Sequence, residues 1–139
     1  MEFKKIHLYG SDIEDYEVLS SLIQDAAIPT SEMMFDKVEK QFFLVCSRFS
    51  WESRLQNKGN KRIVSGICFD NVIEVKKKNF PSFNSENILN FLTLKKVTGF
   101  IELIFSNNIL IKLKGNNISF RIDDLNKEWP TIFSPNHKN

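Results

Sequence analysis

The sequence has little of the chemistry from which most enzymes and metal sites are built. It holds only 2 histidines and 2 cysteines, and His7 and His137 lie at opposite ends of the chain, so neither is placed as a base beside a nucleophile. The recognisable zinc and nucleotide-binding motifs are absent from the sequence. A pair of carboxylates, Glu52 and Glu102, is the remaining enzymatic alternative. We therefore expect no catalytic residue, no metal site and no cofactor, and a small enzyme is the last of three functional hypotheses.

Long hydrophobic runs are also missing. No apolar stretch approaches the ~20 residues that cross a bilayer, and residues 1–8 lack the apolar core of a secretory signal. We accordingly expect a cytoplasmic protein with no membrane contact. The two cysteines, Cys46 and Cys68, cannot form a disulfide framework, and both lie inside apolar runs. The sequence predicts that both are reduced and buried.

Apolar and aromatic residues, in contrast, are plentiful. Hydrophobic residues make up 42% of the chain and 13 of them are Phe, which is enough to form a real core. A chain of 139 residues is about one domain long. We expect a single globular domain over residues 1–133, with residues 134–139 as a frayed tail.

One long helix is predicted near the start of the chain. Ser11-Asp12-Ile13-Glu14 matches a capping box, with the Ser11 hydroxyl as the cap. Apolar residues then recur at steps of three and four, which is typical of an amphipathic helix, and Pro29 ends the segment. The acidic residues of this region are explained mostly by the positive N-terminal end of the helix.

The rest of the chain has the period of strands. The predicted strands are Phe3–Leu8, Met33–Val38, Gln41–Phe49, Ile63–Phe69, Val72–Val75, Ile88–Val97, Phe100–Phe105, Ile109–Leu113 and Ile118–Ile122. Asp70-Asn71 is either a turn or a bulge within one long strand. Asp123 or Asp124 is predicted to cap a short final helix that runs through Trp129.

These elements predict an α+β fold. We expect a predominantly antiparallel sheet of about seven or eight strands, curled into a β-sandwich or partly open barrel, with one long N-terminal helix and a short C-terminal helix. The outline is similar to the pleckstrin-homology-like superfold. This analogy concerns shape and implies no function.

Several landmarks resemble a known family. They are Leu22-Ile23-Gln24-Asp25-Ala26, Phe42 to Leu44 leading into Arg48-Phe49-Ser50-Trp51-Glu52, Phe100-Ile101-Glu102-Leu103-Ile104-Phe105, and Asp123-Asp124-Leu125 with Trp129. Over nearly its whole length the chain is similar to the small bacterial proteins classed as domain of unknown function 2948, found mainly in alphaproteobacteria. The resemblance implies a cytoplasmic bacterial protein and brings no activity that could be assigned to particular residues.

The strongest local candidate for a binding site follows the strand Gln41–Phe49. Arg48, Trp51 and Glu52 lie there, and Gln24 and Asp25 end the helix. One interpretation is structural: Arg48 pairs with Asp25 or Glu52 and joins helix to sheet. The other is that Arg48, beside Trp51, holds an anion or a peptide carboxylate. The leading hypothesis is thus a protein-interaction module, with an extended peptide added to a sheet edge and an unidentified protein as partner.

Lysines supply the alternative hypothesis. Residues 61–100 carry 7 basic and 3 acidic side chains, although the whole chain has a net charge of only +2. A lysine-rich sheet face could bind RNA or another polyanion, and the same lysines could simply be solvated or protect a sheet edge. The candidates are Lys61, Arg62, Lys76, Lys77, Lys78, Lys95, Lys96, Lys112 and Lys114.

Overall fold

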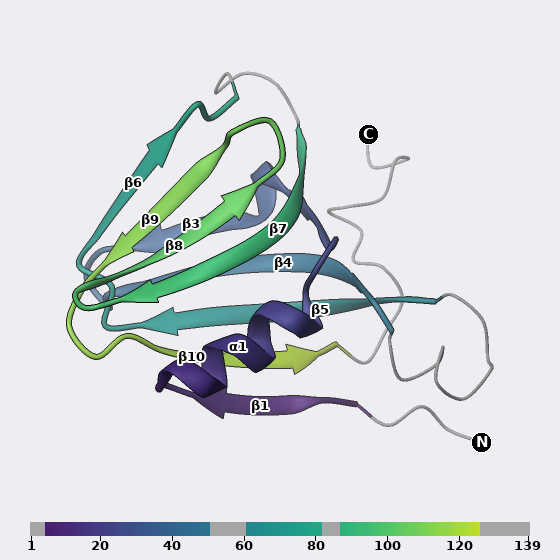
Figure 1. Cartoon of the computed structure of the whole chain (residues 1–139), viewed down its shortest axis with the longest axis horizontal. Helices are drawn as coiled ribbons and strands as arrows, with labels where there is room; N and C mark the ends of the chain where they lie inside the picture. Colours follow the sequence, from purple (N-terminus) through teal and green to yellow (C-terminus); the bar gives the residue numbers. More distant parts are fainter. Residues whose placement is uncertain (1–4, 51–60, 82–86, 126–139) are drawn as a thin grey trace.

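A computed structural model of the chain describes residues 5–50, 61–81 and 87–125. In this part of the chain one α-helix and ten strands are present, with one short 3-10 helix, η1 (Figure 1). Their bounds are β1 His7–Gly10, α1 Ile13–Leu22, β2 Ala27–Pro29, η1 Thr30–Glu32, β3 Met33–Asp36, β4 Gln41–Phe49, β5 Arg62–Asp70, β6 Glu74–Lys78, β7 Ile88–Val97, β8 Phe100–Phe105, β9 Leu110–Lys114 and β10 Ser119–Asp124. No helix of the described ranges is long and apolar enough to span a bilayer.

All the strands belong to one antiparallel sheet that is open at both ends. The strand order is β1-β10-β5-β4-β2-β7-β8-β9-β6, and β3 pairs with β4 beside β2. We call β1, β10, β5 and β4 the first half-sheet, and β7, β8, β9 and β6 the second half-sheet. The short strand β2 joins the halves, because Ala27 is opposite Ser47 of β4 on one side and Asn90 of β7 on the other. Figure 1 shows the second half-sheet folded over the first.

The broad prediction of an antiparallel α+β fold is confirmed, but the predicted number of strands is too low. The sequence did not predict strand β2, because it is only three residues long and ends in Pro29, a residue that indicates the end of a helix. Asp70-Asn71 is a turn: β5 ends at Asp70, Asn71 has φ +70°, and β6 pairs with β9 in the other half-sheet. The predicted C-terminal helix through Trp129 lies outside the described residues.

Helix α1 begins one residue later than predicted. Asp12 is the N-cap, and its carboxylate accepts the backbone N–H of Asp15 at 2.8 Å. The Asp15 carboxylate in turn accepts the N–H groups of Ser11 at 3.0 Å and Asp12 at 3.2 Å, and these bonds lower its pKa. The capping box is therefore Asp12 with Asp15, not Ser11 with Glu14. A Cβ on Gly10 would collide with the Asp15 side chain, so glycine is required where β1 leads into the helix.

The core lies between the two half-sheets and under α1. The predicted core residues Phe42, Phe69, Phe91, Phe105 and Phe120 are each at most 2% exposed. Cys46 and Cys68 are buried and unpaired, as predicted, and burial raises the pKa of Cys46 to about 12. Removing these apolar side chains from water stabilises the packing of the two half-sheets against each other.

Candidate functional site

Arg48, the centre of the predicted binding cluster, is fully buried in the first half-sheet. Its Nε donates to Asp124 Oδ1 at 3.1 Å and its Nη2 donates to Asp124 Oδ2 at 2.8 Å, so the pair is bidentate. Ser65 Oγ donates to Asp124 Oδ1 at 2.6 Å, and the backbone N–H of Ile6 donates to Oδ2 at 2.9 Å. The cluster joins β4, β5 and β10 to the residue before β1.

Hydrogen bonds keep this buried carboxylate ionised. Burial alone would raise the pKa of Asp124, but the hydrogen bonds from Arg48, Ser65 and Ile6, together with the Arg48 charge, outweigh it and lower the pKa. Because the pair is bidentate, buried and surrounded by further donors, Arg48 and Asp124 have a structural role.

Of the two partners predicted for Arg48, Asp25 is not paired with it, and Glu52 lies outside the described residues. Asp25 lies just after α1, where its backbone N–H donates to Phe91 O at 2.9 Å, and Gln24 beside it is exposed. Within the described residues the acidic partner of Arg48 is Asp124, the last residue of β10 and one of the two residues predicted as a helix cap. Strand alternation could have found it, because Asp124 shares the inward face of β10 with Phe120 and Ile122. Two other predicted site residues, Trp51 and Glu52, lie outside the described residues.

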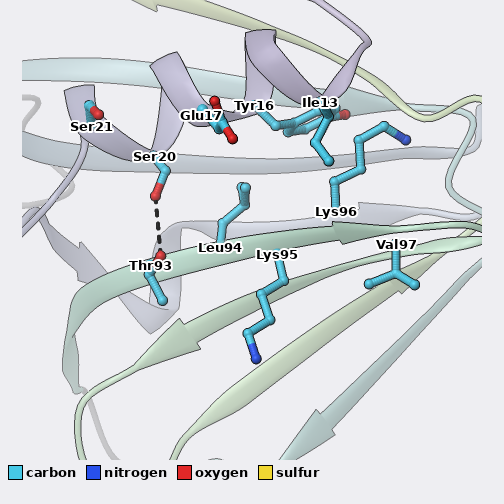
Figure 2. A pocket seen from close by; sticks show the side chains of 10 residues that line it. All are labelled: Ile13, Tyr16, Glu17, Ser20, Ser21, Thr93, Leu94, Lys95, Lys96 and Val97. Carbon is cyan, nitrogen blue, oxygen red and sulfur yellow. Dashed lines mark hydrogen bonds between the residues drawn. The ribbon is translucent and has the colours of Figure 1, made fainter.

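A groove lies between α1 and β7 on the described surface. It holds about 520 Å³, which lies within the usual size range of ligand sites. Figure 2 shows the α1 side chains above it and strand β7 below it. The residues on α1 are Ile13, Tyr16, Glu17, Ser20 and Ser21, and those on β7 are Thr93, Leu94, Lys95, Lys96 and Val97.

The strand that forms one wall of this groove has a free edge. Strand β7 pairs with β8 over most of its length, but on its other side β2 reaches only from Ile88 to Asn90. The pairing of β7 with β8 shifts register between Phe91 and Thr93. From Thr93 to Val97 no strand of the described ranges occupies the side that faces α1. Backbone donors and acceptors on such an edge are available for another strand.

A side-chain contact spans the groove. Ser20 Oγ and Thr93 Oγ1 are 3.4 Å apart and join helix to strand (Figure 2). The Tyr16 hydroxyl donates to Ile118 O at 2.8 Å, so this ring is fixed below the helix. Lys96 extends toward α1, with its Nζ 5.6 Å from the centroid of the Tyr16 ring. Glu17 lies on the helix wall between Ser20 and Tyr16.

Sequence reasoning did not find this groove. It placed Lys96 on the lysine-rich face and explained Glu17 as helix electrostatics. Alternation along β7 was the available signal, because Lys96 follows the buried Leu94 by two residues and so shares its inward face. The side chains of Lys95 and Val97 point the other way in Figure 2.

The nine basic candidates were predicted to line one face of the sheet, but the structure places them on more than one. Lys76, Lys78, Lys95, Lys112 and Lys114 alternate with buried or inward neighbours, and they lie on the outer surface of the second half-sheet, which we call the basic face. The other four lie elsewhere. Lys61 and Arg62 are at the start of β5, where Arg62 stacks on Phe49 at 4.2 Å. Lys77 lies over the Phe80 ring at 4.5 Å, and Lys96 faces the groove.

No group of three or more His, Cys, Asp or Glu side chains that could hold a metal ion is found in the described ranges. In the comparisons with known proteins, a family model described as "Protein of unknown function (DUF2948)" matches residues 6–137. No curated protein and no solved structure gives a match. The resemblance inferred from the residues is thereby confirmed.

Proposed function

Because the chain belongs to the DUF2948 family, whose function is unknown, its role has to be inferred from its own geometry, and we propose that it is a protein-interaction module. In this proposal, an extended segment of a partner protein lies in the groove under α1 and adds a strand to the free edge of β7. The observation that carries the proposal is the free β7 edge from Thr93 to Val97 beside a groove of about 520 Å³.

Backbone pairing supplies the affinity in this mode of recognition. Each added strand residue can pair with β7, and the edge from Thr93 to Val97 is long enough for a few such pairs. Alternate side chains of the bound segment then point toward α1 or away from it. The half-buried Ser20 and the buried Leu94 and Tyr16 form the surface that the inward side chains meet.

Charge makes the partner's chemistry more specific. Lys96 reaches toward Tyr16 in the groove, and Glu17 lies on the helix wall between Tyr16 and Ser20. A bound segment with an acidic side chain opposite Lys96 and a basic or hydroxyl side chain opposite Glu17 complements both. The proposed partner segment is therefore extended and carries an acidic residue, with a basic or hydroxyl residue a few positions away.

Selection of peptides tests this proposal. The purified protein is used to select from a displayed library of random peptides about twelve residues long, and the affinity of a selected peptide is measured by fluorescence anisotropy. Ser20→Trp should weaken binding at least about tenfold, because the indole would fill the groove beside Thr93. Val18→Trp, an exposed change on another side of the same helix, is the matched control and should bind as the unmodified protein does.

A charge reversal gives the second arm. Lys96→Glu should reduce affinity for an acidic peptide by about tenfold, whereas Lys37→Glu, an exposed lysine in the turn after β3, should not. Selection of no peptide, or of peptides that bind Ser20→Trp and Lys96→Glu unchanged, would reject the groove as the site.

A further inference from the structure

The basic face is a second surface, which meets the groove at Lys95 and Val97 of β7. Lys95, Lys112 and Lys76 lie in one cross-strand row, because Lys95 is opposite Glu102, Glu102 is opposite Lys112, and Lys112 is opposite Lys76. Adjacent strands are about 4.8 Å apart, so the row spans roughly 15 Å. Lys114 and Lys78 lie beside it on either side.

The face keeps an excess of positive charge after its acidic residues are counted. Glu74 is 3.6 Å from Lys114 Nζ and 4.0 Å from Lys76 Nζ, and Glu102 lies within the row. These two carboxylates face five lysines, which leaves an excess of three positive charges on a surface only four strands wide. Such a density favours a ligand with regularly spaced negative charges.

Apolar side chains lie among these lysines. Phe100 is half-buried, with Lys112 Nζ 4.4 Å from the centre of its ring. Leu92 is 41% exposed and Val97 is 45% exposed on the same face. A surface for charge alone would not need them, whereas nucleic-acid bases have flat apolar faces that pack on such side chains.

A hollow of about 480 Å³ lies at one end of the basic face. Leu92, Ile104 and Leu110 line it, with Lys78 at its margin. Asn79, Asn107 and Asn108 also line it, and the amide of Asn79 donates to Asn108 O at 2.8 Å. Apolar walls next to amide groups and a lysine match a single base with its phosphate, since amides can hydrogen-bond base edges.

We propose that the basic face binds a single-stranded nucleic acid, with phosphates along the lysine row and one unstacked base in the hollow. A duplex does not fit this arrangement, because its bases are stacked inside and cannot enter the hollow. The site meets the peptide groove at Lys95 and Val97 of β7, but most of its lysine row and of its hollow lies beyond β7 and does not depend on peptide binding.

Binding to a labelled oligonucleotide of about fifteen nucleotides, measured by anisotropy, tests the proposal. With three or four phosphates neutralised, raising the salt concentration from about 50 mM to about 200 mM should weaken binding roughly twenty- to fiftyfold. Lys76→Glu combined with Lys112→Glu should weaken it at least about tenfold. Lys37→Glu combined with Lys40→Glu makes the same change in net charge in the turn before β4 and should have much less effect.

The hollow is tested separately. Leu92→Glu should weaken single-strand binding at least about fivefold, and Val38→Glu, at a residue 86% exposed in a distant turn, should not. Lys76→Gln with Lys112→Gln repeats the charge test if the reversed variant does not fold, which thermal melting reports. Failure to bind any oligonucleotide at about 50 mM salt overturns the proposal. So do equal losses in the paired variants, equal binding of duplex, or binding to vesicles with about 30% phosphatidylserine but not to oligonucleotide.

Discussion

Asp124→Ala is expected to lower the free energy of unfolding by about 3–5 kcal/mol, a large loss for a single polar residue. The change leaves the guanidinium of Arg48 buried without its bidentate partner, and it also removes the acceptor of Ser65 Oγ–H and of the Ile6 N–H. A marginally stable domain of this size has about 5–15 kcal/mol in total, so the variant should be largely unfolded or melt far earlier. Chemical denaturation with circular dichroism measures the difference.

A double variant separates the pair from its surroundings. Arg48→Met combined with Asp124→Leu removes both charges and keeps apolar volume, so it should recover much of the stability that Asp124→Ala loses. A loss below about 1 kcal/mol in Asp124→Ala would mean that the buried pair does not hold the strands together.

The same carboxylate gives a pH dependence with a definite sign. The folded state lowers the pKa of Asp124 below its usual value of 3.8. The stabilisation that the ionised Asp124 carboxylate gives the folded state is therefore fully present above pH 3.8. It is lost as the pH falls through the lower pKa that Asp124 has in the folded state. The difference in unfolding free energy between the unmodified protein and Asp124→Asn should shrink in that acidic range.

Tyr16→Ala should cost about as much, roughly 3–5 kcal/mol. Tyr16 is 1% exposed, its ring centroid lies 4.8 Å from that of Phe120, and its hydroxyl donates to Ile118 O at 2.8 Å. The change leaves a cavity under α1 and frees the helix from the first half-sheet. Tyr16→Phe keeps the ring and loses only the hydrogen bond, so it should cost about 1 kcal/mol.

Thermal and denaturant melts of the two Tyr16 variants measure this contribution. A melt of Tyr16→Ala equal to that of Tyr16→Phe would contradict the view that the ring anchors the helix. If the anchor is lost as expected, peptide binding in the groove should be lost with it, because α1 forms one wall.

The strands most easily predicted were long segments rich in apolar residues and followed by turn residues. Ile88–Val97 and Phe100–Phe105 were predicted with the bounds that β7 and β8 have. Strand β2 was missed because three residues ending in proline carry no period. The capping box was predicted one residue early because Ser11 and Asp12 are both good N-cap residues. Only the path of the chain from β1 into α1 determines which of them is the N-cap.

The candidate site was harder to predict than the fold. Arg48 and Asp124 are 76 positions apart, and their contact depends on β5 lying between β4 and β10. The groove exists because β2 pairs with only part of β7. No local sequence pattern predicts where that pairing ends. Composition alone predicted one group of lysines. The alternation of side-chain direction along each strand separates Lys77 and Lys96 from the five lysines on the basic face.

Amide hydrogen exchange tests the central claim most directly. The exchange of backbone amides is followed by NMR in the free protein and with a peptide selected against the groove at saturation. Strand addition predicts that amides of the free edge between Thr93 and Val97 become protected, while the edge of β6 on the far side of the sheet is unchanged. Unchanged exchange along that edge, with protection elsewhere or nowhere, would contradict the account.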